Sequence, residues 1–391
     1  MSLLPFCLLV GLATTSVQSH QQEQQGHVKL SAPTFQSWET IGNFETARKF
    51  HGSTLINNKM YIFGGDFFNA SATLFFSDVQ FLSLNVDDGT IIPNSLSFAQ
   101  SFSIGRSGLG VASYNNYVYL VGGFTGTALL DDVQIGHVEE NGQILSWQTS
   151  PFRLNAARSN HRLEVVQTAS GTTYLVAIGG LSQTSSDVIP VDQIEVAEIY
   201  ANASISSWHT CDYHLKGGRL LLATNVVNNT LYVIGGAGSF SLGEVFSDIQ
   251  FAPIQNDGCP DSWSTSAHTL KIPLYGHTSL TINSNTFIVL GGIAAQGNYF
   301  NNVQFSSLHT DDVDTKPWIL DRNQFSVPRY GHTSVQLNNK FLYVIGGRSQ
   351  QQQADLNDIQ MSVVNVATAL DDKILGRNMW VTQLTETINN Y

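Results

Sequence analysis

Short runs of apolar and β-branched residues recur along the chain, and six of them end in a Gly-Gly pair. The runs read MYIF, VYLV, LVAI, LYVI, FIVL and LYVI, and the pairs are Gly64–Gly65, Gly122–Gly123, Gly179–Gly180, Gly235–Gly236, Gly291–Gly292 and Gly346–Gly347. Successive pairs lie 58, 57, 56, 56 and 55 residues apart. Self-similarity at a nearly fixed period marks a repeat architecture. We therefore divide the chain into six similar units.

Each unit contains further recurring residues around its Gly-Gly pair. An arginine stands about 16 residues before the pair and is followed three residues later by His or an apolar residue, as in Arg48 and His51; the fifth unit has Leu274 instead of the arginine. An Asn-rich turn precedes the glycine run, and a D-V-Q-like segment follows the pair. Because Asn tolerates the positive φ of tight turns, these turns predict hairpins. The tryptophans that end the later units are Trp147, Trp208, Trp263, Trp318 and Trp380, and the first unit offers Phe98 nearby.

Four short strands per unit, with no helical periodicity anywhere, predict an all-β fold. Four-stranded units repeated four to eight times are typical of a β-propeller, since no unit can bury both of its faces without neighbours. We predict a six-bladed β-propeller with four antiparallel strands per blade. Each Gly-Gly pair is expected to end a second strand, and each tryptophan to lie on an outer strand.

The Gly-Gly doublet, the spaced Tyr and Trp and the Arg-x-x-His segment together resemble the kelch motif, over residues 38–391. The resemblance implies a kelch-type propeller. The D-V-Q and N-x-D-G variant is also similar to secreted or cell-surface kelch proteins with galactose-oxidase-like central domains. A closed ring needs one more outer strand, and Trp38 and Trp380 both fit that place. The N-terminal strand is favoured, and closure by the C-terminal strand alone is the alternative.

The N-terminus has the layout of a secretory signal peptide. Residues 3–13 are apolar but too few to span a bilayer, and Val17 and Ser19 stand at the −3 and −1 positions of a cleavage site before His20. We therefore assign residues 1–19 to the signal and 20–37 to a lead-in segment. No other stretch is long and apolar enough for a membrane anchor. The expected location is outside the cell, or in the periplasm or on the surface of a bacterium.

Export bears on the cysteines and on three glycosylation sequons. Cys7 leaves with the signal, so the mature chain keeps Cys211 and Cys259, and the sequence leaves open whether they form a disulfide. The candidate glycosylation sites, which matter only in a host that glycosylates exported proteins, are Asn69, Asn202 and Asn228.

The charge balance narrows the classes of partner. Lys and Arg number 18 against 30 Asp and Glu, which gives a net charge of −12. Nucleic acids and anionic membranes both favour a basic surface, so neither is expected as a partner. Charged residues make up only 12% of the chain while 42% are apolar, which argues against disorder.

The repeated arginines are the first candidate for a ligand site. In a propeller, the residues before each innermost strand lie at one mouth of the central channel, so these arginines could form a broken ring suited to carboxylates. The kelch resemblance adds that some kelch domains bind acidic peptides through arginines at similar positions, and that a bacterial kelch-type mutarotase acts on sialic acid. The alternative is a structural role, with each arginine bonding backbone carbonyls of the next blade. The five residues are Arg48, Arg106, Arg158, Arg219 and Arg329.

Aromatic residues in the loops after the Gly-Gly pairs are the second candidate. These loops should reach the same mouth, where aromatic rings can stack on sugars or anchor a protein partner. The alternative is that the rings only pack the loops. The principal candidates are Phe67, Phe68 and Tyr299.

The sequence favours a monomeric binding module for an extracellular protein or glycan, the ligand being acidic if the arginines bind it, over an enzyme. The rival hypothesis is a mutarotase or epimerase acting on a carbohydrate acid, which needs little beyond a pocket and one acid–base group. A copper oxidase is the least favoured: Tyr275 with His277 and Tyr330 with His332 occupy repeat positions. We predict no catalytic residue, no metal and no cofactor.

Overall fold

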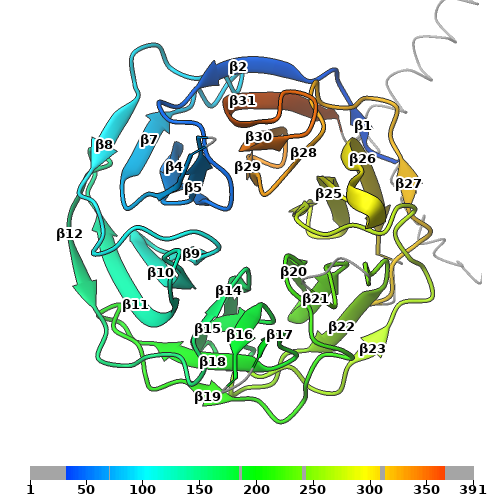
Figure 1. The fold of residues 1–391 in the computed structure, drawn as a ribbon. Coiled ribbons are helices and arrows are strands. Elements are labelled where there is room, and N and C mark those ends of the chain that lie inside the picture. The colour runs from blue at the N-terminus through cyan, green and yellow to red at the C-terminus, as the bar shows by residue number, and fades with distance from the viewer. Residues whose placement is uncertain (1–31, 70, 185–186, 240–243, 309–312, 366–391) are drawn as a thin grey trace, which may run out of the picture. The chain divides into compact units, whose positions relative to one another are not determined.

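The computed structural model describes residues 32–69, 71–184, 187–239, 244–308 and 313–365, in which the regular structure is β apart from one 3₁₀ turn at Ala295–Gly297. Thr34–Asn365 form one compact unit. Its strands pair antiparallel into six sheets of four or more strands and two smaller ones (Figure 1). No helix that could cross a membrane occurs in these residue ranges. The predicted signal segment, its cleavage site before His20 and Trp380 lie outside them.

Five of the sheets share one meander topology, with strands in sequence order. The first contains β3 (Gly52–Ile56), β4 (Lys59–Phe63), β7 (Val79–Ser83) and β8 (Ser97–Ala99), and the second contains β9 (Gly110–Tyr114), β10 (Tyr117–Phe124), β11 (Leu129–Val138) and β12 (Ile144–Thr149). The third contains β14 (Arg162–Gln167), β15 (Thr173–Ile178), β18 (Ile194–Ile199) and β19 (His209–Thr210). The fourth contains β20 (Ala223–Val227), β21 (Thr230–Ile234), β22 (Ile249–Pro253) and β23 (Ser264–Thr265). The fifth contains β24 (Thr278–Ile282), β25 (Thr286–Ile293), β26 (Tyr299–Ser307) and β27 (Ile319–Leu320).

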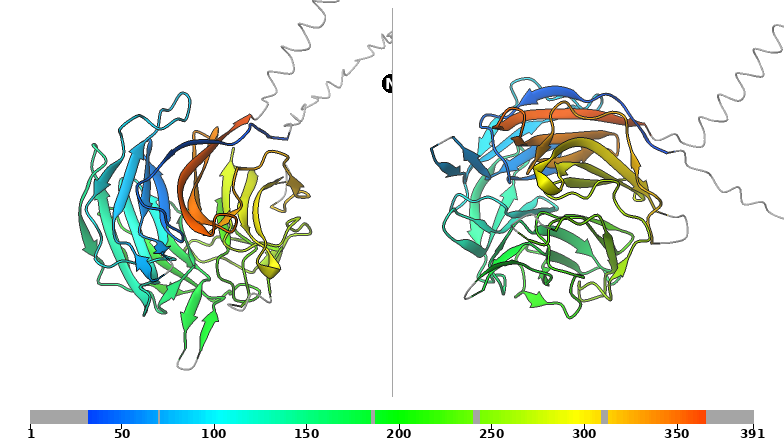
Figure 2. Two further views of the ribbon diagram at one scale, coloured as in Figure 1. Left: turned by 45° about the horizontal axis from the view of Figure 1, so that its top comes forward. Right: turned by 45° about the vertical axis from the view of Figure 1, so that its right-hand side comes forward.

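The sixth sheet is built from both ends of the described chain. Its inner strands are β29 (Thr333–Leu337), β30 (Phe341–Ser349) and β31 (Ala354–Asn365), with β28 (Arg329–Tyr330) also on β30. The outer strand is β2 (Glu39–Asn43), which pairs with β31 and follows Trp38 directly; β1 (Thr34–Phe35) pairs with the far end of β31 (Figure 2). The strand that completes this sheet is therefore N-terminal, as favoured from the sequence.

The inner strands contact one another in a cyclic order, β3–β9–β14–β20–β24–β29 and back to β3. Beside them a ring of six backbone hydrogen bonds of 2.7–3.0 Å links the segments that precede these strands. Each amide in the ring donates to the carbonyl of the preceding unit, and all six residues have φ between 52° and 62°. Its members are Phe50, Gly108, Asn160, Leu221, Gly276 and Gly331. We call this feature the backbone ring.

Apolar side chains fill the space between successive sheets. For example, Tyr119 and Val121 of β10 pack with Leu175 and Ala177 of β15, and all four are fully buried. Such clusters contain residues of two neighbouring sheets, so each sheet depends on its neighbours for burial. An all-β array of this kind fits a β-propeller.

The Gly-Gly pairs lie where the second strand ends or shifts register. β4, β15 and β21 end directly before their pairs, while β10, β25 and β30 continue through them with a register shift. Gly122 shows why glycine is needed: its φ is 60°, and a Cβ there would lie 2.6 Å from the carbonyl oxygen of Arg158 in the next unit. Any side chain would force neighbouring sheets apart.

The described tryptophans occupy the predicted outer positions, and Phe98 of the first unit lies near the equivalent position. Trp147 lies in β12, and Trp208, Trp263 and Trp318 directly precede β19, β23 and β27. Phe98 pairs with Gln80 as Thr149 pairs with Gln134, so Phe98 lies two residues after the tryptophan position and is 48% exposed. Leu96 holds that position in the first unit.

Cys211 and Cys259 form a disulfide, with 5.6 Å between their Cα atoms. Cys211 follows β19 and Cys259 follows β22, so the bond joins the outer parts of the third and fourth sheets. The pairing that the sequence left open is present in the structure.

The double substitution Cys211→Ala with Cys259→Ala is expected to lower the free energy of unfolding by about 2–4 kcal/mol, because the disulfide closes a loop of 48 residues in the unfolded chain. Urea denaturation under non-reducing conditions measures the loss. Dithiothreitol should destabilise the unmodified protein equally and leave the variant unchanged. A double variant with the same free energy of unfolding as the unmodified protein would show that the disulfide does not stabilise the fold.

Candidate functional site

The five predicted arginines lie inside the sheets, without exposed side-chain surface. Each lies before an innermost strand and forms an ion pair with a carboxylate that lies in the third strand of its own unit or directly before it. The partners of Arg48, Arg106, Arg158, Arg219 and Arg329 are Asp78, Asp132, Glu195, Asp248 and Asp358 in that order.

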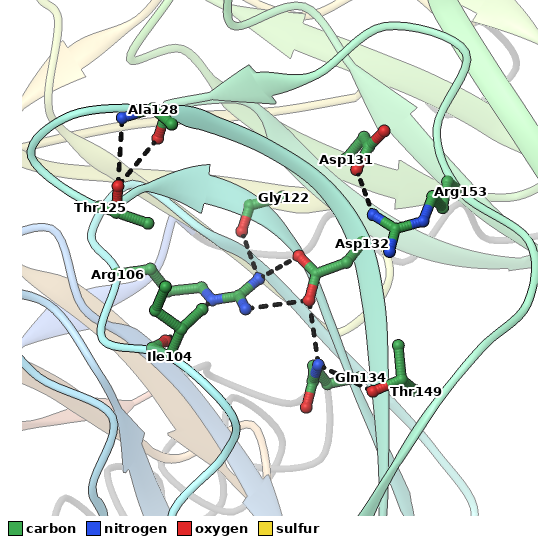
Figure 3. A network of polar contacts seen from close by, with 10 residues as sticks. All are labelled: Ile104, Arg106, Gly122, Thr125, Ala128, Asp131, Asp132, Gln134, Thr149 and Arg153. Atoms are coloured by element: carbon green, nitrogen blue, oxygen red, sulfur yellow. Dashed lines mark hydrogen bonds and ion pairs between the residues drawn. The ribbon is translucent and has the colours of Figure 1, made fainter.

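Arg106 illustrates the arrangement (Figure 3). Its Nη1 donates to Asp132 Oδ1 at 2.6 Å and to the carbonyl of Gly122 at 3.0 Å, and its Nη2 donates to Asp132 Oδ2 at 3.0 Å. Gln134 Nε2 donates to the same carboxylate. Burial alone would raise the pKa of Asp132, but hydrogen bonding by Arg106, its positive charge and Gln134 lower the pKa below the usual value. The guanidinium is thus fully engaged within the chain.

This placement corrects the expectation of an open arginine ring. Buried guanidinium groups held by carboxylates do not face solvent, and their role here is structural. The structural role given as the alternative agrees with this burial, but the expected bonds to carbonyls of the next blade are wrong, because each side chain bonds a carbonyl of its own unit. The next unit is reached through the backbone instead: the amide of Gly65 donates to the carbonyl of Arg106, and the amide of Gly236 donates to that of Leu274.

The carboxylate partners were not identified from the sequence, although a pattern marks them. The fifth unit, which has Leu274 in place of the arginine, also has Asn302 in place of the aspartate, so both members of the pair are absent together. In the third unit Glu195 replaces the usual Gln, and it both pairs with Arg158 and accepts a hydrogen bond from the amide of Asn155. Because each unit has both the arginine and the carboxylate or lacks both, comparing the units would have indicated that the two side chains pair.

The repeated histidines are also buried between sheets. A hydrogen bond of 2.8 Å joins His51 Nε2 to Thr333 of the sixth sheet. Burial, with a smaller contribution from neighbouring arginines, lowers the pKa of His51, His161 and His277 to about 3 and that of His332 well below its usual value. All four are neutral at ordinary pH. Over the described ranges, no three metal-ligating side chains cluster.

The three loop aromatics come together in one open pocket of about 550 Å³. Phe67 and Phe68 belong to the short strand β5 (Asp66–Phe68), which pairs with β6 (Thr73–Phe75), and Tyr299 begins β26. Phe68 is 44% exposed. Arg348 lines the same pocket, with its guanidinium carbon 5.8 Å from the centre of the Phe68 ring.

A buried charged cluster holds this pocket in place. Asp355 accepts hydrogen bonds from the amide of Phe68 at 2.8 Å and from Arg348 at 3.0 Å. Its carboxylate lies 3.7 Å from Lys49, which also pairs with Asp66. Burial raises the pKa of Asp66 despite the opposing charge of Lys49. Because these partners come from β5, β30 and β31, the cluster fixes the position of the first-unit hairpin against the sixth sheet.

The pocket adjoins the backbone ring and one sequon. Tyr330 lies between Tyr299 and Phe50, with ring centres 5.0 and 5.5 Å away, and Phe50 belongs to the backbone ring. Asn69 lines the pocket and is exposed, as are Asn202 and Asn228 at the other two sequons. All three sequon asparagines are thus sterically open to modification.

Comparisons with known proteins give two matches to this chain. A kelch motif is recognised over residues 105–135, which include Arg106, the second Gly-Gly pair and Asp132. The Rho GTPase-activating protein gacHH of Dictyostelium discoideum is 25% identical over 95 residues, which cover 24% of this chain and only 6% of that protein. The kelch motif and the all-β array together support a kelch-repeat protein with a propeller-like fold, and such repeats generally mediate binding between proteins.

Proposed function

We propose that this chain is an exported, closed six-bladed kelch propeller that binds a partner through the pocket of Phe67, Phe68 and Tyr299. The observation that carries the proposal is the gathering of these three loop aromatics around one open pocket, although Tyr299 lies more than 200 residues after Phe67 and Phe68 in sequence. Partly exposed aromatic rings around a fixed concavity are the usual anchors of a protein interface. An extracellular protein is the favoured partner, and a glycan stacked on the rings is the alternative.

Two features support the finer parts of the proposal. The cyclic contacts of the inner strands and the backbone ring favour closure into six blades. The disulfide and the three exposed sequons are features of chains that mature in an oxidising, glycosylating compartment, and they agree with the signal segment inferred from the sequence.

The substitutions Phe68→Ala and Tyr299→Ala are each expected to weaken partner binding at least about tenfold. Truncating an aromatic anchor of an interface commonly costs about 2 kcal/mol or more of binding free energy. Peptide and glycan arrays probed with the mature protein would first identify ligands, and affinities for these ligands would then be measured in solution. Ligands found on the peptide array would indicate a protein partner, and ligands found on the glycan array would indicate a glycan.

Phe98→Ala is the matched control, because Phe98 is as exposed as Phe68 but lies on the outer strand β8. It should bind every ligand as the unmodified protein does. Ligands that retain full affinity for both pocket variants would show that this pocket is not the binding surface.

A further inference from the structure

A second cavity, of about 340 Å³, lies among the innermost strands. It is lined by residues of all six of them and extends from the histidine positions toward Leu55 and Gln336. A small adjoining space is lined by members of the backbone ring. The cavity is therefore the central channel of the array, with the backbone ring at one end.

Two charged side chains, Arg162 and Glu164, line this channel, and both come from β14. They interrupt the repeat. The five residues at the position of Arg162 in the other units are Gly52, Gly110, Ala223, Thr278 and Thr333, and those at the position of Glu164 are Thr54, Ala112, Asn225, Leu280 and Val335. Nothing in the repeat requires a charge at either position.

Each of the two charged groups is only partly engaged by the described residues. Arg162 donates from Nε to the carbonyl of Leu222 at 2.8 Å and from Nη2 to the carbonyl of His277 at 3.0 Å, which orients the guanidinium and leaves Nη1 without a protein acceptor. Glu164 accepts a hydrogen bond from Thr224 at Oε1, and Oε2 has no donor. The two side chains form no ion pair with each other. The positive charge of Arg162 still acts on Glu164: burial raises the pKa of this carboxyl, and the hydrogen bond from Thr224 and the charge of Arg162 partly offset the rise.

Two serine hydroxyls add to this unfilled hydrogen-bonding capacity. Ser53 and Ser334 line the same channel, and their hydroxyl oxygens are buried without a hydrogen-bond partner among the described residues. Buried hydroxyls without partners are costly, and the charges of the half-buried Arg162 and Glu164 are only partly compensated. A ligand that supplied an acceptor to Arg162 and a donor to Glu164 would relieve both.

We propose that the central channel binds a small zwitterion of the α-amino-acid type, with its carboxylate on Arg162 Nη1 and its ammonium group on Glu164 Oε2. The channel offers one positive and one negative group, so a ligand of no net charge with both functions complements it fully. The serine hydroxyls provide further hydrogen bonds to the same ligand. This site is separate from the aromatic pocket, and neither proposal depends on the other.

Titration calorimetry of the mature protein with each standard L-α-amino acid, up to about 10 mM, tests the proposal. At least one should bind saturably. The corresponding amine without a carboxylate and the acid without an amine should each bind at least about tenfold more weakly, since each loses one charge-assisted hydrogen-bonding partner. Glycerol and glucose serve as neutral probes and should not bind.

Glu164→Gln and Arg162→Met should each weaken binding of that amino acid at least about tenfold. Glu164→Gln keeps the shape of the side chain and so tests the site even if Arg162→Met fails to fold. Arg153→Met, which alters an exposed arginine on the outside of the second sheet, should bind normally. The proposal is overturned if only heats of dilution appear, if the single-charge analogues or neutral probes bind equally well, or if Glu164→Gln retains full affinity.

Discussion

Replacing Arg106 with methionine is expected to lower the free energy of unfolding by about 3–5 kcal/mol, the usual cost of removing one partner from a buried ion pair. Asp132 would remain buried without its countercharge, and the carbonyl of Gly122 would lose its side-chain donor. Urea denaturation followed by tryptophan fluorescence measures the loss, because Trp208, Trp263 and Trp318 are buried between the sheets and report their separation.

The chain supplies two controls for this substitution. Arg153 forms an ion pair with Asp131 nearby, but both side chains are exposed, so Arg153→Met should change stability by no more than about 0.5–1 kcal/mol (Figure 3). The double variant Arg106→Leu with Asp132→Asn reproduces Leu274 and Asn302 of the fifth unit and should recover much of the loss. An Arg106→Met variant as stable as Arg153→Met would refute the structural role of the arginines.

Acidification is expected to destabilise the protein steeply between about pH 6.5 and pH 3. The native pKa of His51, His161 and His277 is about 3 and that of His332 is also strongly lowered, so the unfolded state binds protons that the native state excludes. Their stabilising contribution is fully present above pH 6.5. It falls by up to about 1.4 kcal/mol per pH unit for each histidine in this window.

The carboxyl groups with shifted pKa values modify this pH dependence without reversing it. Asp132, with its lowered pKa, adds to the loss at the acid end, while Asp66 and Glu164, with raised pKa values, oppose it. His161→Leu is the matched variant because Leu109 and Leu222 stand at the same repeat position. It should unfold at lower pH than the unmodified protein in acid titrations followed by circular dichroism. Acid unfolding unchanged by this variant would exclude His161 as a cause.

Most of the fold could be predicted because the same requirements recur in every repeat. Positive φ and close backbone approach at the end of the second strand admit only glycine, so the Gly-Gly pairs fix both the number of units and their internal phase. The first unit, in which the sequence offers Phe98 near the place of the missing tryptophan, departs from the repeat. The first unit has Leu96 rather than Trp at the outer position, and the nearest aromatic residue lay two residues away on a strand that exposes it.

The candidate site was harder to predict because it depends on distances between units. The sequence placed the arginines near the channel but did not show that they are buried, which follows from their ion pairs with carboxylates two strands away in the same unit. The loop aromatics were identified, but Arg348 and Asp355 were not, since they fall outside the repeated positions. Arg162 and Glu164 were missed for a similar reason. That they line a common cavity can be seen only once the six inner strands are placed around it.

The pairing of β2 with β31 has a consequence for how the chain is made. Thr40 of β2 pairs with Gln360, so β2 is synthesised 320 residues before β31, its one strand partner among the described residues. Until then it is an unpaired edge, which is prone to join other chains. The entropy of closing so long a loop grows slowly with length, so the long separation lowers the final stability little. It mainly slows folding and prolongs the time during which the edge of β2 is exposed. Completion of the array must therefore wait for the synthesis of β31, and a product truncated before β31 would retain an open sheet.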